Sequence, residues 1–360
     1  MRLKQGGVAH TAWVIEDDLS DRETVLRQQH IEGLADLAAC ALSSRSANTA
    51  EWQAVLPRQT GDEKSKERYI SRFLGNPLID PLMVMGGFIP EIADIAGSHG
   101  KTIVLSMDQS KISDGFECLM IAIRVGERAI PMAWKVRETS GGIGFDVQES
   151  LLGAVYAMLP EGRPVLLTGD RFYGNAALIR WCGKQGWQYR LRLKDNLILH
   201  HEGGEITTGE AATAGMTSLL NAVLNETGVK THIGILHEKG HKEPWIIAMS
   251  DTPSKGRVLD YGMRWGIEPL FSDFKSRGFG IAQTQLKHAS RIERLILVLT
   301  VALYWAASTG MQPKPAKYTP KKEERSLISF FKRGIRILLN AALTLAPIPK
   351  LWAYAQLVGW

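Results

Sequence analysis

Two short apolar runs of β-forming residues constrain the fold more than any other feature, because an aspartate follows each of them at once. Residues 102–107 (Thr-Ile-Val-Leu-Ser-Met) precede Asp108, and residues 164–169 (Pro-Val-Leu-Leu-Thr-Gly) precede Asp170. Such runs predict buried strands that end at the two aspartates. A buried strand holds a carboxylate with little freedom, as a reactive site requires. Either aspartate alone also fits the ordinary role of capping a turn or a helix.

The segments around these runs predict a mixed α/β sheet. Further strands are expected over residues 117–125, 128–136 and 187–193, with helices over 147–159 and 175–183. The resulting order is three strands, a helix, a strand, a helix and a strand. This order is typical of a mixed sheet with an antiparallel meander at one edge.

Changes of texture divide the chain into four parts. We expect a helical N-terminal domain over 1–98, an α/β core over 99–194 and 252–310, a β-rich insertion over 195–251, and a basic C-terminal arm and helix over 311–360.

Three segments outside the central strands have more specific patterns. Within the insertion, residues 218–225 have helical spacing, whereas 231–236 and 245–249 predict a hairpin. A single helix is expected over 256–275.

The formal net charge of +6 is unevenly distributed. Residues 1–100 carry 10 Lys and Arg against 14 Asp and Glu, whereas residues 252–360 carry 17 against 6. The basic C-terminal third favours a polyanionic partner, although a solvated basic face would look the same. Candidate cations for recognising DNA ends are Arg68 and Arg72, or the run Lys332, Arg333 and Arg336.

Other bulk features indicate an ordinary globular protein. The chain has 360 residues, 45% of them hydrophobic, which is enough for real cores. The three cysteines, Cys40, Cys118 and Cys182, are too far apart for a disulfide framework, so a reducing cytoplasm is expected. No signal peptide is apparent at the N-terminus. The apolar segment 295–310 is short for a membrane span, so we interpret it as a buried helix.

A third acidic residue lies among regularly spaced polar side chains: Tyr261, Arg264, Glu268 and Lys275. On a helix, Arg264 to Glu268 is one turn and Glu268 to Lys275 is two, so the acid would lie between two cations on one face. A surface ladder of salt bridges has the same spacing. Against it, the neighbouring apolar residues, among them Trp265, indicate a packed helix.

Two strand aspartates and a third carboxylate meet the needs of phosphoryl transfer. Hard oxygen ligands are those that Mg²⁺ prefers. Two such ions about 4 Å apart can activate a water and stabilise a leaving oxygen. Asp108, Asp170 and Glu268 are therefore candidate metal ligands.

These residues resemble a known family. The spacing Tyr-x2-Arg-x3-Glu-x6-Lys is similar to the signature of the large branch of DDE transposases of bacterial insertion sequences. Residues 169–175 (Gly-Asp-Arg-Phe-Tyr-Gly-Asn) and 189–194 (Tyr-Arg-Leu-Arg-Leu-Lys) resemble that family around its second aspartate, and 106–110 (Ser-Met-Asp-Gln-Ser) around its first. The resemblance covers roughly residues 101–310. Gln109 and Ser110 depart from any preference for Thr after the first aspartate.

The resemblance implies a ribonuclease-H-like core and a set of site residues. Asp108, Asp170 and Glu268 would be catalytic and would bind two Mg²⁺ or Mn²⁺ ions. Contacts to DNA are expected from five residues: Tyr261, Arg264, Lys275, Arg171 and Trp245. Members of this branch excise through a DNA hairpin, and Trp245 could stack on a flipped base there; a core position is the ordinary role of such a residue.

The implied function is transposition. Water would hydrolyse one strand at the element end, and the freed 3′-hydroxyl would attack target DNA at the same site. The partners would be double-stranded DNA, as terminal inverted repeats and target, and a second copy of the chain. The location would be the cytoplasm, at the nucleoid. Two alternatives are a catalytically silent, transposase-derived DNA-binding protein and a ribonuclease-H-like nuclease without strand transfer.

Three other patterns carry less weight. His237 and His241 flank the H-E-x-x-H spacing of zinc proteases, but the surrounding residues are strand-like and Gly240 fits a turn. Residues 97–102 lack the first glycine of a phosphate loop. Asp114 is close to Asp108 in sequence, but with Gly115 it fits a turn.

Overall fold

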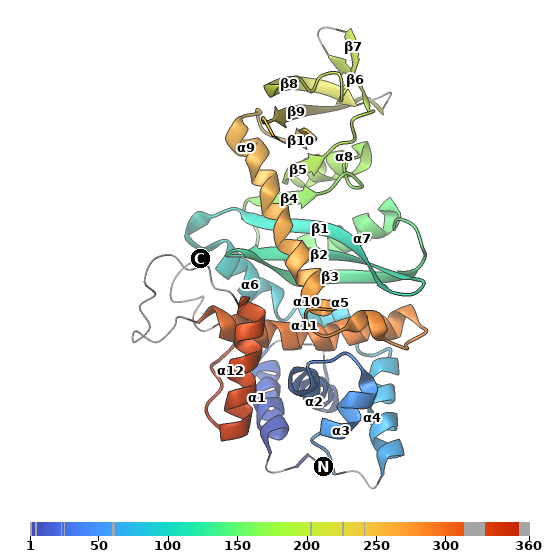
Figure 1. Ribbon diagram of the computed structural model, residues 1–360, viewed down its shortest axis with the longest axis vertical. Helices are drawn as coiled ribbons and strands as arrows, with labels where there is room; N and C mark the ends of the chain where they lie inside the picture. The colour runs from blue at the N-terminus through green and yellow to red at the C-terminus, as the bar shows by residue number, and fades with distance from the viewer. Residues whose placement is uncertain are drawn as a thin grey trace.

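The computed structural model describes residues 2–3, 6–22, 24, 26–59, 62–201, 204–224, 227–240, 242–312 and 328–352 (Figure 1). Helices gather at the N-terminal end of the long axis, and a sheet extends from the middle of the molecule to the opposite end. The expected linker over 311–324 lies mostly outside the described residues.

The N-terminal region is helical, as expected. It contains α1 (Gly7–Asp21), α2 (Gln28–Ser44), α3 (Thr49–Val55), α4 (Glu63–Gly75), α5 (Pro81–Met85) and α6 (Ile89–Ala96), followed by the short 3₁₀ segment η1 (Ser98–Gly100). Side chains of Asn48, Asp62 and Asp80 accept hydrogen bonds from the first-turn amides of α3, α4 and α5. These caps satisfy donors that have no partner within a helix, so these three residues set where α3, α4 and α5 begin.

Ten strands form one sheet in the described part of the chain, in the order β3-β2-β1-β4-β5-β10-β9-β8-β6-β7. Their bounds are β1 (Ile103–Ser113), β2 (Phe116–Val125), β3 (Arg128–Glu138), β4 (Val165–Gly169), β5 (Gln188–Arg192), β6 (Ile198–His201), β7 (Gly204–Thr207), β8 (Gly215–Leu224), β9 (Val229–His237) and β10 (Trp245–Met249). β1 pairs in parallel with β4 and β4 with β5, while β2 and β3 form the antiparallel meander. The sheet is therefore mixed, as predicted.

The expectation that a strand ends at Asp108 is wrong. β1 continues through Asp108 to Ser113, and Asp108 pairs with Met120 of β2. The polar residues 109–111 stay in the strand because β2 provides a hydrogen-bonding partner along its whole length. Asp170, in contrast, directly follows β4 as expected.

The insertion strands extend the central sheet, since β10 pairs antiparallel with β5 (Figure 1). The predicted hairpin is present as β9 and β10. The helix predicted over residues 218–225 is wrong, because β8 occupies residues 218–224 and pairs with β9. Pairing with β9 overrides the local helical spacing, with an irregularity between Leu219 and Ala222.

Helices α7 (Phe145–Met158) and α8 (Ala176–Gln185) lie where they were predicted. The single helix expected over 256–275 is instead three successive segments: α9 (Lys255–Leu259), the 3₁₀ segment η3 (Asp260–Gly266) and α10 (Ile267–Phe274). Pro269 thus falls in the first turn of α10, where a missing amide hydrogen costs little. Together the three segments run along the sheet past β4 and β1 (Figure 1).

α11 (Ala289–Met311) is the central helix of the fold and contains the apolar segment 295–310. By length and composition it could cross a membrane, but its apolar window is entirely buried inside the structure. It packs against α2, α4 and β3, so its apolar character is explained by its place in the core.

The C-terminal helix α12 (Phe330–Thr344) packs closely on α11 through two glycines. A Cβ atom on Gly334 would overlap the carbonyl oxygen of Ala306, and one on Gly310 would overlap that of Phe330. The missing side chains let the two backbones touch, which fixes the position of α12 and of its basic residues.

We expect Gly334→Ala to lower the free energy of unfolding by about 1–3 kcal/mol, because the helices must move apart to accept a methyl group. Thermal and urea unfolding would measure this. Gly153→Ala in α7 is the matched control, since nothing lies within 4 Å of its Cβ position. The control should raise stability by about 0.5–1 kcal/mol through helix propensity. A Gly334→Ala variant as stable as the control would contradict the close packing.

Candidate active site

The register of β1 and β4 brings the two aspartates together. Met107 pairs with Gly169, so Asp108 and Asp170 occupy the next positions on adjacent parallel strands, which lie about 4.8 Å apart. One pair earlier, the hydroxyls of Ser106 and Thr168 are 2.9 Å apart. Side chains two residues apart share a face, so Asp108 and Asp170 project to the side marked by this hydrogen bond.

Arg264 joins the third acid to the first. Its guanidinium lies 3.3 Å from Asp108 Oδ2 and 2.9 Å from Glu268 Oε1. The predicted one-turn spacing of Arg264 and Glu268 thus produces a direct ion pair. The Asp108 and Arg264 side chains are 17% and 10% exposed, whereas Glu268 is 59% exposed. Glu268 therefore has room to turn, while the other two side chains are held in place.

The surroundings of Asp108 disfavour the charged form of its carboxyl group. Burial is the largest cause of the raised pKa of Asp108, about 6 instead of 3.8, and the negative charge of Asp170 adds to it. The amide of Gln109, which donates to Asp108 Oδ1 at 2.8 Å, and the charge of Arg264 oppose the rise. The site therefore favours additional positive charge beside Asp108.

Lys275 lies just past the end of α10, so the prediction that it shares one helical face with Arg264 and Glu268 is wrong. It nevertheless reaches the same site, because its Nζ donates to Ser110 Oγ at 2.6 Å. Ser110 is two residues beyond Asp108 on the same face of β1. Burial lowers the pKa of Lys275.

An aromatic cluster adjoins Arg264. Trp245 packs edge-on against Tyr261 and Trp265, with ring centroids 5.2 and 5.6 Å apart, and Arg264 lies over the Tyr261 ring. Tyr261 is buried and Trp245 is half-buried, so both belong partly to the core. Trp265 is 53% exposed and presents the larger free aromatic surface, whereas its sequence context predicted a residue packed in a helix.

Arg171 connects the loop after β4 to the β9–β10 turn through an ion pair with Glu243. Arg192 on β5 binds the same carboxylate at 3.2 Å. Since Leu191 pairs with Gly169, Arg192 is the β5 neighbour of Asp170. Arg192 lies in the run 189–194 but was not among the predicted site residues; alternation of side chains along the strand is the signal that would have indicated it.

Three buried donors of the site have no hydrogen-bond partner among the described residues: Arg264 Nε, Arg192 Nε and the Tyr173 hydroxyl. Tyr173 follows Asp170 in the same loop, and the charges of Asp108 and Asp170 help to raise its pKa after burial. Buried donors without partners are costly. Their presence beside the acids suits a ligand rich in acceptor oxygens, such as a phosphate.

The donor set suits a hard cation, but the side chains do not yet form a ligand sphere. In the described part of the chain no group of three His, Cys, Asp or Glu side chains is arranged to hold a metal ion. Asp108 and Glu268 instead bind the same guanidinium. The carboxylates thus fit Mg²⁺ or Mn²⁺ in chemistry, and Arg264 would have to release one of them for the three to converge.

Other candidates lie away from this cluster. Asp114 is in the exposed turn between β1 and β2, paired with Lys111 at 2.8 Å. His237 ends strand β9, so the zinc-protease spacing is not helical there; His241 lies outside the described residues.

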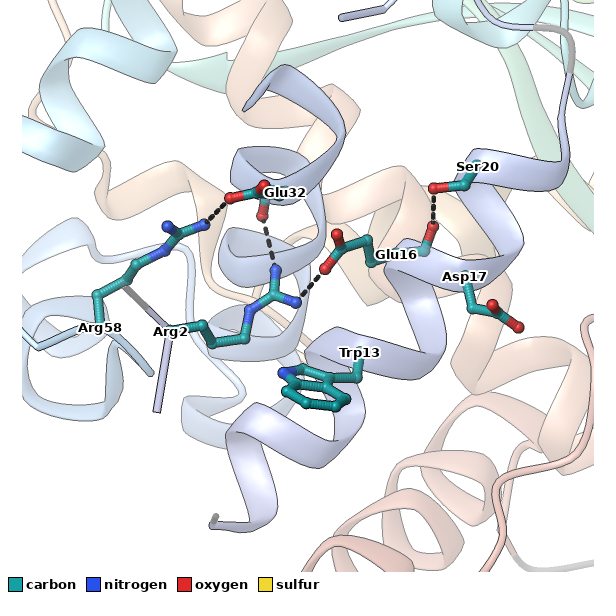
Figure 2. A pocket seen from close by; sticks show the side chains of 7 residues that line it. All are labelled: Arg2, Trp13, Glu16, Asp17, Ser20, Glu32 and Arg58. Atoms are coloured by element: carbon teal, nitrogen blue, oxygen red, sulfur yellow. Dashed lines mark hydrogen bonds and ion pairs between the residues drawn. The ribbon is translucent and has the colours of Figure 1, made fainter. Parts of the chain in front are cut away.

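A cavity of about 750 Å³ lies between the second half of α1 and the start of α2 (Figure 2). Its arginines are already committed: Arg2 bonds Glu16, and Arg58 bonds Glu32 at 2.8 Å. Both also bond the fully buried Asp36. Among the described residues, this cavity therefore offers no free cation for a phosphate.

We expect Asp108→Asn to stabilise the protein in EDTA at neutral pH. The raised pKa of Asp108 corresponds to at most roughly 3 kcal/mol of destabilisation of its charged form. A carboxyl whose folded pKa is raised destabilises the fold above that pKa, and the penalty fades as pH falls. The thermal advantage of the variant should therefore shrink from pH 7 to pH 4. Added Mg²⁺ should raise the melting temperature of the wild type more than that of the variant. A pH-independent difference would contradict the electrostatic account.

Comparison with known proteins supports one family for the central part of the chain. Residues 149–305 match the family model described as Transposase DDE domain. The matched segment is somewhat less than half of the chain; it includes Asp170 and Glu268 and begins after Asp108. No curated protein matches the chain. The mixed α/β fold is compatible with the ribonuclease-H-like fold of such enzymes, and the match supports a DDE transposase, a metal-dependent DNA-cleaving enzyme.

Proposed function

We propose that this protein is a DNA transposase that cleaves the ends of a mobile element and joins them to target DNA. One observation carries the proposal: Asp108 and Asp170 follow Met107 and Gly169, the last paired residues of the parallel strands β1 and β4, and Arg264 joins Glu268 of the matched DDE segment to Asp108. The proposed branch is that of bacterial insertion sequences with the Tyr261, Arg264, Glu268 and Lys275 spacing.

Asp108, Asp170 and Glu268 would hold two Mg²⁺ or Mn²⁺ ions. When bound, these ions supply charge neutralisation at the scissile phosphate and activation of the attacking oxygen. The chain's own residues do the rest. The two aspartates are held by their strands, while the exposed Glu268 turns from Arg264 to join them.

The cations around the acids would position the DNA. Arg264, once released from Glu268, and Lys275 would donate to phosphate oxygens, with Tyr261 keeping Arg264 in place through ring stacking. Arg171 would contact the backbone after exchanging Glu243 for phosphate. Because Trp265 is more exposed than Trp245, we propose Trp265 as the surface that meets an unpaired base and Trp245 as its support.

The proposed division of labour follows the sequence texture. Residues 99–194 and 252–310 would form the catalytic core, 195–251 an insertion that contacts the element end, and 1–98 with the C-terminal arm the elements of end recognition. Joining two ends requires at least two copies of the chain on DNA. The reaction would take place at the nucleoid in the cytoplasm.

We expect Asp108→Asn, Asp170→Asn and Glu268→Gln each to slow cleavage of element-end DNA by roughly 100-fold or more, because each removes charge from the site that offsets the cations. DNA binding in EDTA should be retained. Cleavage would be followed on gels with Mg²⁺ and a duplex containing the element's inverted repeat. Asp114→Asn is the matched control and should cleave normally, since Asp114 lies in an exposed turn.

Normal cleavage by any of the three variants would remove that residue from the site. A supplied pre-cleaved end separates the remaining alternatives. Joining of its 3′-hydroxyl to target DNA by the wild type supports a transposase. Cleavage without joining supports a nuclease, and binding without either supports a silent DNA-binding protein.

A further inference from the structure

A second basic site lies outside the acidic cluster, in a pocket of about 380 Å³ between the end of α2, the turn after α10, and α12. Four cations line it: Arg45, Arg277, Lys332 and Arg336. All four are exposed, and its lining includes no acidic residue. We name it the basic pocket.

The fold gathers these cations from three distant segments by specific contacts. The amide of Ala47, just past α2, donates to the Phe279 carbonyl at 2.6 Å. The Phe279 ring packs edge-on against Phe331 of α12, with centroids 5.3 Å apart. The glycine contacts of α12 with α11 hold the third wall. The cations are therefore brought together by packing, and none of the described residues that line the pocket is acidic.

None of the four cations forms an ion pair with a residue in the described ranges. Asp273 interacts with Lys332 and Arg277 through charge, but it is buried and its carboxylate is bonded to Arg128. Like charges that face one pocket repel each other, and water screens this only in part. Four such charges without counterions therefore suit a polyanionic ligand.

One tight turn links the basic pocket to the acidic cluster. In this turn the amides of Gly278 and Gly280 both donate to the Lys275 carbonyl, at 3.1 and 2.8 Å. A Cβ on Gly278 would overlap the carbonyl oxygen of Asp273, so the turn is closed on itself. Lys275 at its start reaches Ser110 beside Asp108, and Arg277 two residues later lines the pocket. The two cations are thus held in a fixed relation.

We propose that the basic pocket binds the phosphate backbone of the DNA strand that enters the acidic cluster, as a second anchoring site displaced from the scissile phosphate. This inference rests on the proposed function, because DNA is then the polyanion at hand. Arginine and lysine contacts to phosphate set register without reading sequence, so the pocket binds duplexes of any sequence alike.

The test compares the salt dependence of DNA binding for two variants of equal net charge. Arg277→Gln/Arg336→Gln removes two pocket cations; Lys101→Gln/Lys184→Gln removes two exposed lysines, one just before β1 and one on α8. Anisotropy of a fluorescein-labelled duplex is titrated in EDTA over a NaCl series with the full chain. Each phosphate contact contributes about 0.9 to the slope of log K against log salt.

We expect the slope of the pocket variant to be less steep by roughly 1–2, for the presumed element end and a scrambled duplex alike, and that of the control to match the wild type. Equal slopes for both variants would overturn the proposal. Lost binding to anionic lipid vesicles with an unchanged DNA slope would assign the pocket to a membrane surface.

The assay contains no cleavage step, so its failure is separate from failure of the proposed function. If Asp108→Asn cleaves normally while the pocket variant loses slope, the pocket stands as a DNA-binding site and the catalytic assignment falls. If the slopes are equal while Asp108→Asn is inactive, the catalytic assignment stands and the pocket falls.

Discussion

The hydrogen-bonded register between β1 and β4 is the constraint on which the site depends. Because Met107 faces Gly169, the next residues of both strands are acids on one face of the sheet. A slip of one residue would turn Asp108 to the opposite face, where its neighbours Leu105 and Met107 are fully buried. The apolar cores of these strands thus set the chemistry as well as the fold, since their burial opposes any such slip.

Arg264 explains how this acidic cluster is compatible with a folded protein in the absence of bound cations. Acids so close together, one of them largely buried, repel one another, and the raised pKa of Asp108 records that repulsion together with its burial. A guanidinium bonded to Asp108 and Glu268 supplies the missing positive charge. Arg264 donates a single hydrogen bond to each acid, and its Nε has no partner among the described residues. A phosphate could take the place of the carboxylates as the acceptor of these bonds.

The sequence predicted the parts of this structure that depend on local pattern. The central strands, α7, α8 and the one-turn relation of Arg264 to Glu268 follow from apolar runs and helical spacing. It failed where pairing with the next strand overrides the local pattern: β2 extends β1 beyond Asp108, and β9 holds residues 218–224 as a strand. The sequence indicated Lys332 and Arg336 as candidate DNA contacts but not the pocket itself, because Arg45 and Arg277 join them only through the packing of α12 on α11 and the hydrogen bond of Ala47 to Phe279.

The continuity of the sheet has a mechanical consequence. β10 is hydrogen-bonded to β5, and β9, β8, β6 and β7 follow it in that order. β5 in turn is the neighbour of β4, which Asp170 directly follows. Each of these strands is joined to the next by backbone hydrogen bonds, so the place of the outer strands is tied to that of β5 and β4. A duplex bent against the far end of this sheet would therefore change the spacing of the two aspartates, because every strand between them and the bend is hydrogen-bonded to the next.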